Sequence, residues 1–248
     1  MKRKLQLLFF LFILGCFLLF IASFFWSKSR YELNEWWYDQ INENSYVATK
    51  AELNAILSEF EIVPFKDLPQ NYLVYSQSQV AKYLGMVKNG TYYKIPNQAI
   101  YRKIIGHNRI KDLISRDDLF AEAVQDQEGH FIWLLNKKVL YKFIDLQDAL
   151  TAKEYDRDAL TIISGHRTPK HNNRVGGASR SRHIVGEALD FRVGDVNKDG
   201  RYTAADKDII LELADKQIIK NQGGVGRYPN TRTVHIDVRG FRARWNTH

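Results

Sequence analysis

Two histidines and one aspartate in the C-terminal half of the sequence have the residue types of a metal site. His183 and Asp190 are seven residues apart, and His235 follows in a later segment. Catalytic zinc takes three protein ligands of nitrogen or oxygen type and leaves a fourth position for water, and these side chains would supply that set. Zinc there would activate water for attack on a carbonyl group. A His and an Asp at this spacing are also common without metal, so the spacing alone leaves both readings open.

Three short segments with strand character would position these side chains. Residues 160–163 are apolar and rich in β-branched types, and residues 188–193 resume strand character after Gly186. Residues 234–238 alternate, so that His235 and its neighbour Asp237 face the same side of a strand. We therefore expect an α+β fold in which an antiparallel sheet bears the ligands and helices flank it.

The order of the motifs resembles one metallopeptidase family. Residues 181–190 (SRHIVGEALD) resemble the SxHxxGxAxD signature of the zinc D-Ala-D-Ala carboxypeptidases and related murein endopeptidases. Residues 164–169 (SGHRTP) and 175–179 (VGGAS) resemble the segment that precedes this signature. Residues 223–229 followed by 234–237 resemble the closing strands of the murein endopeptidase branch, which ends in His-x-Asp. The resemblance implies a LAS-type metallopeptidase with the hedgehog/DD-peptidase fold.

The resemblance also implies roles for individual residues. His183, Asp190 and His235 match the zinc ligands, and Arg167 matches the arginine that holds the substrate carbonyl or the developing oxyanion. Ser181 is expected either to contact the substrate or to orient its loop.

The general base is less directly implied, because the chain departs from the family pattern. Many relatives place a glutamate three residues before the last ligand, and this chain has Arg232 there. Asp237 matches the aspartate of the endopeptidase branch. It is expected to act as the catalytic base or to orient His235 from behind.

The activity implied by the resemblance is zinc-dependent hydrolysis of amide bonds in bacterial peptidoglycan stem peptides or cross-links, as a DD- or LD-endopeptidase. A carboxypeptidase that trims terminal D-Ala is the enzymatic alternative. A catalytically silent zinc module that binds peptidoglycan or a partner is the other, because hedgehog domains share the fold without a known peptidase role. A basic segment before the ligands would attract peptide carboxylates: it contains Arg167, Lys170, Arg174, Arg180 and Arg182.

Residues 195–206 (DVNKDGRYTAAD) fit a twelve-residue calcium loop, with oxygen-bearing residues at positions 1, 3 and 5, glycine at 6 and a carboxylate at 12. The loop resembles the dockerin type of EF-hand loop, which ends in Asp. The expected ligands are the side chains of Asp195, Asn197, Asp199 and Asp206 and the carbonyl of Arg201. A solvated polar turn would have the same composition. Calcium here would stiffen the region beside the zinc site.

The first 26 residues predict a transmembrane signal anchor. Three basic residues at positions 2–4 precede an almost unbroken apolar run over residues 5–26, which is long enough to cross a bilayer. Residues 13–16 (ILGC) weakly resemble a bacterial lipoprotein box, the competing interpretation. We expect a single-pass anchor in the bacterial inner membrane, with the catalytic domain periplasmic or otherwise outside the cytoplasm.

Residues 27–130 are expected to form a small α+β or spacer region of unknown role, before a metallopeptidase domain over residues 131–248. Thr49 and Glu52 predict a helix start with a capping box, and Asn89-Gly90 predicts the turn of a hairpin over residues 85–95. The formal net charge of +8 favours acidic partners. No nucleic-acid-binding motif is present, so nucleic acid is not expected among them.

Overall fold

The computed structural model describes residues 9, 12–19, 36–38, 40–41, 46–114 and 129–246. The chain divides into two units, Met1–Ser45 and Tyr46–His248. The predicted three-part division at residues 26 and 130 stays a prediction.

The predicted transmembrane helix is wrong as an element of this fold. Within the described residues, none of the helices has the length and apolar character needed to cross a bilayer. Residues 12–19 are helical, and at 1.5 Å per residue such a helix is much shorter than a hydrocarbon core of about 30 Å. Most of the apolar run over residues 5–26 lies outside the described residues. The described residues give no support to membrane attachment through this helix.

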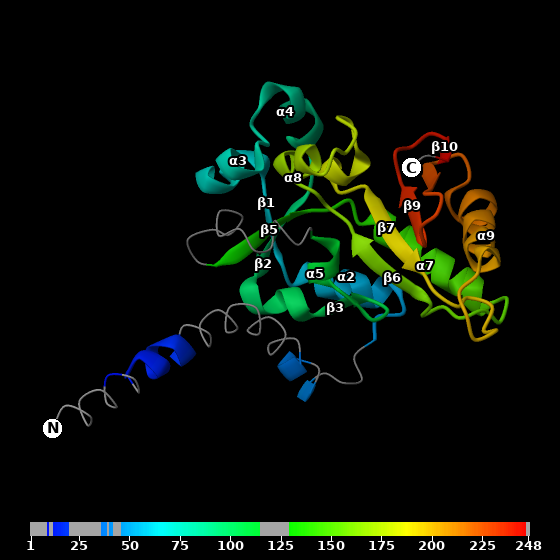
Figure 1. Ribbon diagram of the computed structural model, residues 1–248. Coiled ribbons are helices and arrows are strands. Elements are labelled where there is room, and N and C mark those ends of the chain that lie inside the picture. The colour runs from blue at the N-terminus through cyan, green and yellow to red at the C-terminus, as the bar shows by residue number, and fades with distance from the viewer. Residues whose placement is uncertain are drawn as a thin grey trace. The chain divides into compact units, whose positions relative to one another are not determined.

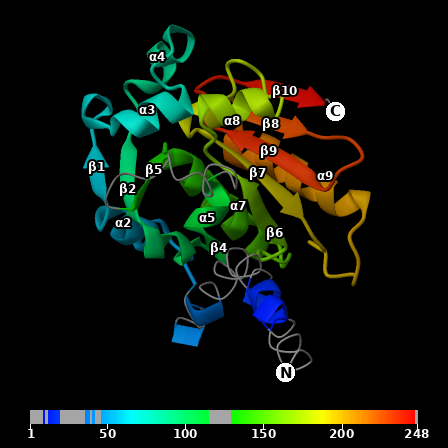
Figure 2. The same ribbon diagram turned by 60° about the vertical axis from the view of Figure 1, so that its left-hand side comes forward.

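A five-stranded sheet forms the centre of the second unit, with the strand order β10-β8-β9-β7-β6 (Figures 1 and 2). Neighbouring strands are antiparallel except that β10 runs parallel to β8, so the sheet is mixed where a purely antiparallel one was expected. The strands are β6 (Leu160–Ser164), β7 (Ala188–Val193), β8 (Gly224–Arg227), β9 (Thr233–Asp237) and β10 (Ala243–Asn246).

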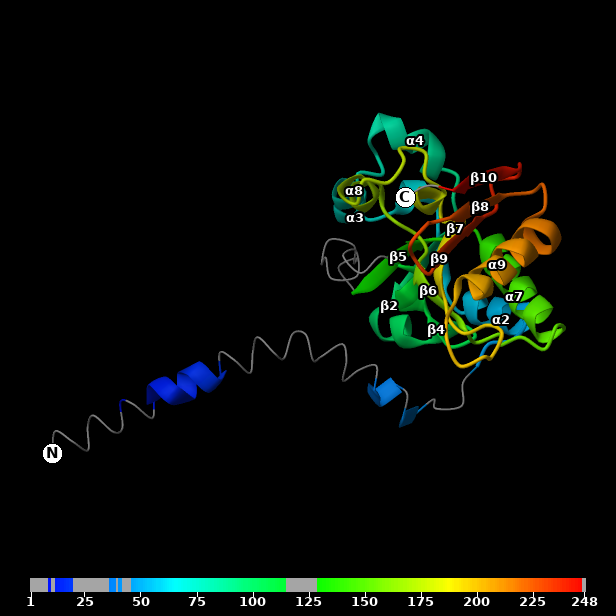
Figure 3. The ribbon, with the colours of Figure 1, turned by 45° about the vertical axis from the view of Figure 1, so that its right-hand side comes forward.

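Two long helices cover this sheet (Figure 3). Helix α7 (Lys138–Thr151) packs Phe143 against Phe191 of β7, with ring centroids 5.3 Å apart. Successive side chains of a strand point to opposite faces, so α7 lies on the face opposite Asp190. Helix α9 (Ala204–Leu213) packs on β7 and β9 and continues into the π-helix η5 (Ala214–Ile219). The face opposite α7 carries Asp190 and His235, and the short helix η4 (Arg182–Val185) contacts β7.

A three-stranded sheet, in the order β1-β2-β5, joins residues on either side of position 130. Strand β2 (Tyr92–Pro96) pairs with β1 (Glu61–Val63) on one side and with β5 (His130–Leu134) on the other. The smaller elements around it are α2 (Lys50–Ser58), η1 (Phe65–Asp67), α3 (Gln70–Ser76), α4 (Ala81–Val87), η2 (Asn97–Tyr101), β3 (Lys103–Ile105), β4 (Asn108–Arg109) and α5 (Ile110–Leu113).

Local predictions in this region had mixed outcomes. The helix start at Thr49 is confirmed: its side chain accepts from the Glu52 amide, and the Glu52 carboxylate accepts from the Thr49 amide. The hairpin predicted over residues 85–95 is wrong, because residues 81–87 form α4. Strand β2 instead finds its partners in β1 and β5, which are distant in sequence. Tertiary pairing here overrides the local turn signal.

Candidate metal and catalytic site

His183, Asp190 and His235 converge in the structure, and we refer to them as the metal group. Their ligand atoms all lie within 4.8 Å of one another, and all three residues are buried. The Nδ1 atom of His235 is 2.8 Å from Oδ1 of Asp190 and 3.3 Å from Nε2 of His183. Oδ2 of Asp190 is 3.2 Å from Nε2 of His183. Two imidazoles and one carboxylate thus direct their metal-binding atoms at one another.

Strand pairing and one tight loop bring these side chains together. Asp190 on β7 and His235 on β9 are direct partners in the antiparallel register, so both point to the same face. His183 lies on the short helix η4 (Arg182–Val185). Ser181 caps this helix, because its Oγ accepts a hydrogen bond from the His183 amide at 3.4 Å. Gly186 ends η4 with φ of 66°, a conformation that favours glycine.

Substituting Gly186 tests how tightly this loop is held. A Cβ at this position would lie 2.3 Å from the backbone oxygen of Leu134, which cannot move aside as a side chain would. Gly176 has a similar φ of 69° with nothing within 4 Å, so it is the matched control. We expect Gly176→Ala to cost about 1–2 kcal/mol and Gly186→Ala clearly more, measured by urea unfolding. Equal losses would show that the contact with Leu134 relaxes freely.

Each histidine of the metal group has a second partner that fixes its ring. Nδ1 of His183 lies 2.5 Å from the backbone oxygen of Gly165, and Nε2 of His235 lies 3.1 Å from Oδ2 of Asp237. If these outer nitrogens donate to their oxygen partners, the inner nitrogens carry free lone pairs. The inner atoms are then Nε2 of His183 and Nδ1 of His235, the tautomers that a metal ion requires.

The protonation states also suit a cation. Burial lowers the pKa of His183 and favours its neutral form. Burial alone would raise the pKa of Asp190, but the two histidines lower it well below its ordinary value, so the carboxylate is ionised. For His235, burial acts to lower the pKa, and hydrogen bonds to Asp190 and Asp237 outweigh it and raise the pKa. The group thus holds an ionised carboxylate and a neutral imidazole, while the raised pKa of His235 means that a metal ion would have to displace a proton from its Nδ1.

Arg167 lies beside the metal group. Its Nη2 donates to Oδ2 of Asp190 at 2.5 Å, and its Nε donates to Oγ of Ser164 at 2.9 Å. The Nη1 group makes no hydrogen bond to the described part of the chain. The guanidinium is thus held at two nitrogens, while the third can donate to another acceptor.

Asp237 lies behind His235, fully buried. Besides His235, it accepts from the amide of Gly224 at 2.9 Å and from Nε of Arg239 at 2.8 Å. Burial alone would raise the pKa of Asp237, but the contacts with His235 and Arg239 hold it far below its ordinary value. A carboxylate with so many donors is a strong orienting group and a weak proton acceptor.

Arg239 was not singled out in the sequence, although it ion-pairs with Asp237. Its guanidinium also lies over the rings of Phe241 and Trp245, with Trp245 in turn 4.9 Å from the His235 ring. The only signal in the sequence was its place two residues beyond Asp237, because Arg239 lies past the end of β9.

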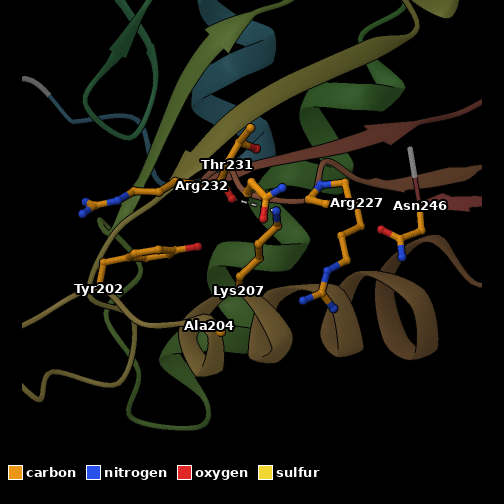
Figure 4. A pocket seen from close by; sticks show the side chains of 9 residues that line it. Tyr202, Ala204, Lys207, Arg227, Thr231, Arg232 and Asn246 are labelled. Atoms are coloured by element: carbon orange, nitrogen blue, oxygen red, sulfur yellow. Dashed lines mark hydrogen bonds between the residues drawn. The ribbon is translucent and has the colours of Figure 1, made fainter. Parts of the chain in front are cut away.

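The position three residues before His235 does not serve the metal group. Arg232 lies over the ring of Tyr202, at 4.4 Å from its centroid, and lines a separate pocket (Figure 4).

The calcium site expected over residues 195–206 stays a prediction, and the carboxylates of this loop do not converge as a group of three. Over the described residues, the metal group is the one cluster of three or more acidic, histidine or cysteine side chains whose ligand atoms converge. Asp206 instead caps α9, where its Oδ2 accepts from the Thr203 amide at 2.7 Å and its Oδ1 from the Val196 amide at 2.9 Å. The Asp195 carboxylate accepts a hydrogen bond from the Gly200 amide at 2.8 Å. Amides of the loop, including that of Thr203 just before α9, thus donate to the Asp195 and Asp206 carboxylates.

Comparison with known proteins places the metal group inside a recognised domain. Residues 117–237 match the family described as Peptidase M15. A probable peptidoglycan L,D-endopeptidase MepK of Haemophilus influenzae is 25% identical over 120 residues, which cover 46% of this chain and 56% of that protein. The peptidoglycan L,D-endopeptidase MepK of Escherichia coli is 29% identical over 87 residues, covering 33% of this chain and 41% of that protein. The matches thus span about half the length of these relatives, 56% of the first and 41% of the second. No solved structure matches it.

Proposed function

Residues 117–237 belong to the Peptidase M15 family, and from this premise we propose that the protein is a zinc-dependent endopeptidase that hydrolyses amide bonds in bacterial peptidoglycan peptides. The observation that carries the proposal is the convergence of His183, Asp190 and His235 inside the matched segment. Two imidazole nitrogens and one carboxylate oxygen are a ligand set of catalytic zinc, which leaves the fourth position for water. Both histidines have outer partners that orient such ligands.

The residues around the metal group suggest how the reaction proceeds. Zinc, when bound, polarises the scissile carbonyl and lowers the pKa of the attacking water. Arg167 has its Nη1 available to donate to the carbonyl oxygen as negative charge develops there, and its contacts with Asp190 and Ser164 hold it in place. Ser181 fits the role of orienting the His183 loop, since its hydroxyl oxygen accepts a hydrogen bond from the His183 amide. Asp237 fits the role of orienting His235, given its donors and its low pKa.

Replacing Arg167 separates oxyanion stabilisation from metal binding. We expect Arg167→Lys to lower kcat/KM by roughly 10²–10³, since one charge-assisted donor to the transition state is lost. The zinc content should stay near that of the wild type because all three ligands remain. Arg242→Lys, at an exposed arginine that pairs with Asp215, should leave kcat/KM unchanged. Unchanged activity in Arg167→Lys would exclude a role of Arg167 in oxyanion stabilisation and leave only its ion pair with Asp190.

The substrate is proposed from the names of the relatives and from charge. Both relatives are named as peptidoglycan L,D-endopeptidases, so the site is proposed to act outside the cytoplasm, on the cell wall. The arginines and lysine between positions 167 and 182 would attract the free carboxylates of stem peptides. We further propose a structural calcium ion for the 195–206 loop, to be checked by metal analysis of the wild type and Asp195→Ala; identical calcium contents would exclude it.

The decisive experiment is digestion of purified sacculi by the full-length protein with zinc. We expect soluble muropeptides cleaved within the peptide portion, identified by mass spectrometry, and no release after treatment with a chelator. Loss of terminal D-Ala alone would indicate a carboxypeptidase. Binding to sacculi without any cleavage would indicate a catalytically silent module and would overturn the proposal.

A further inference from the structure

One line of paired residues crosses the five-stranded sheet through the metal group. Trp245 on β10 is the register partner of Gly226 on β8, and Gly226 is in turn the partner of His235 on β9. Asp190 on β7 follows as the next partner of His235. Figure 2 shows these four strands side by side, with β10 at the edge of the sheet. Because register partners point to the same face, Trp245 lies on the face that carries the metal group.

The indole of Trp245 lies where a side chain at position 226 would be. A Cβ at Gly226 would lie 2.4 Å from Cε2 and 2.6 Å from Nε1 of Trp245, which is too close for any side chain. The indole thereby reaches the His235 ring, and the centroids of the two rings are 4.9 Å apart. The His235 ring also meets the His183 ring, at a centroid distance of 5.1 Å. Two aromatic neighbours and the contact with Asp237 thus restrict rotation of the His235 ring.

Arg239 connects the indole to the carboxylate behind His235. Its guanidinium carbon lies 5.2 Å from the centroid of the Trp245 ring, a distance at which a cation is attracted to an aromatic ring. The same guanidinium donates from Nε to Oδ1 of Asp237 at 2.8 Å and from Nη2 to Oδ2 at 2.5 Å. Asp237 is the partner of Nε2 of His235. Trp245 is therefore connected to His235 twice, by direct contact and through the Arg239–Asp237 pair.

These contacts come from residues beyond the segment that matches the family. The match ends at residue 237, before both Arg239 and Trp245. Trp245 is partly exposed, and none of the four residues of β10 is buried. The indole is therefore not part of the core, and its ring contacts are with His235 and Arg239. Strand β10 thus gives the metal group a contact that the matched segment by itself lacks.

We propose that Trp245 is a positioning residue that holds the His235 ring for zinc, directly and through its contact with Arg239. The inference rests on the proposed function only in taking the metal group as a zinc site. Nδ1 of His235 has to stay directed at Asp190 for the three ligand atoms to converge. An imidazole that is already held in this orientation binds the metal more tightly, because less conformational freedom is lost on binding.

The test compares the zinc affinities of full-length variants by competition with a chelator. Trp245→Leu removes the ring and keeps an apolar side chain. We expect its dissociation constant for zinc to rise about tenfold, the lower end of the effect of losing an outer partner of a metal-bound histidine. Trp245→Phe keeps a ring over Gly226 and should restore most of the affinity. With cobalt(II) in place of zinc, the visible absorption band should shift in Trp245→Leu and stay close to that of the wild type in Trp245→Phe, since the band follows the ligand geometry.

Arg244→Gln is the control for a loosened β10. Arg244 precedes Trp245 on the same strand and ion-pairs with Asp215, away from the metal group. Its replacement weakens the attachment of the strand without removing a contact of His235, so the zinc affinity should stay unchanged. Equal dissociation constants in Trp245→Leu and the wild type would overturn the inference, as would an equal loss of affinity in Arg244→Gln or in Trp245→Phe.

The two proposals fail in different ways. Zinc binding that depends on Trp245 without any release of muropeptides would count against the proposed function alone. Release of muropeptides with an unchanged zinc affinity in Trp245→Leu would count against the role of Trp245 alone.

Discussion

Alanine in place of His183 is expected to remove bound zinc and to lower peptidoglycan cleavage by at least about a thousandfold. A bound metal supplies several kcal/mol of transition-state stabilisation, and each 1.36 kcal/mol is a factor of ten in rate. The two remaining ligands, Asp190 and His235, would leave an incomplete set. Zinc content by mass spectrometry and muropeptide release by chromatography measure the two effects separately.

His107 provides the matched control for this substitution. It is an exposed histidine that lies 3.9 Å from a carboxylate oxygen of Asp158. His107→Ala should keep both zinc and activity, and circular dichroism should show both variants folded. A folded His183→Ala protein that retains one zinc per chain would contradict the assignment of His183 as a ligand.

Substitution of Asp237 is expected to weaken zinc binding, which distinguishes an orienting carboxylate from a catalytic base. Asp237 accepts from Nε2 of His235, and removing such a partner of a metal-bound histidine costs about 10–100-fold in metal affinity or activity. Asp237→Asn keeps the volume of the side chain but loses its charge. We expect its dissociation constant for zinc to rise by this factor, measured by competition with a chelator, and excess zinc to restore much of the activity.

A catalytic base would give the opposite pattern. Zinc affinity would then be unchanged in Asp237→Asn, and activity would stay low at saturating zinc. Asp215→Asn controls for the loss of an arginine-paired aspartate, because Asp215 ion-pairs with Arg242 and Arg244 away from the metal group. It should change neither zinc affinity nor cleavage.

Local signals in the sequence predicted local structure well where no distant partner competed. The Thr49–Glu52 capping box needs only residues within one turn of helix, and it forms as predicted. The alternation around His235 and Asp237 likewise places both on one side of β9, because strand periodicity is a property of the backbone. The hairpin expected near Asn89-Gly90 fails because the partners of β2 are β1 and β5, the second of which lies beyond residue 129.

The sequence by itself determined the residue types of the metal group and the motif order typical of the family. It also determined the alternation that places His235 and Asp237 on one side of β9. Only the tertiary structure decided which atoms meet. The β7–β9 register sets Asp190 beside His235 across 45 residues, and the carbonyl of Gly165 selects the inner nitrogen of His183. The surroundings of Asp237 could not be predicted either. Its carboxylate accepts from the Gly224 amide, which lies 13 residues earlier in the chain, and its contacts with His235 and Arg239 lower its pKa. Residue types and their spacing along the chain indicate which chemistry is possible. The protonation and orientation of each side chain depend on neighbours that only the folded chain brings into contact.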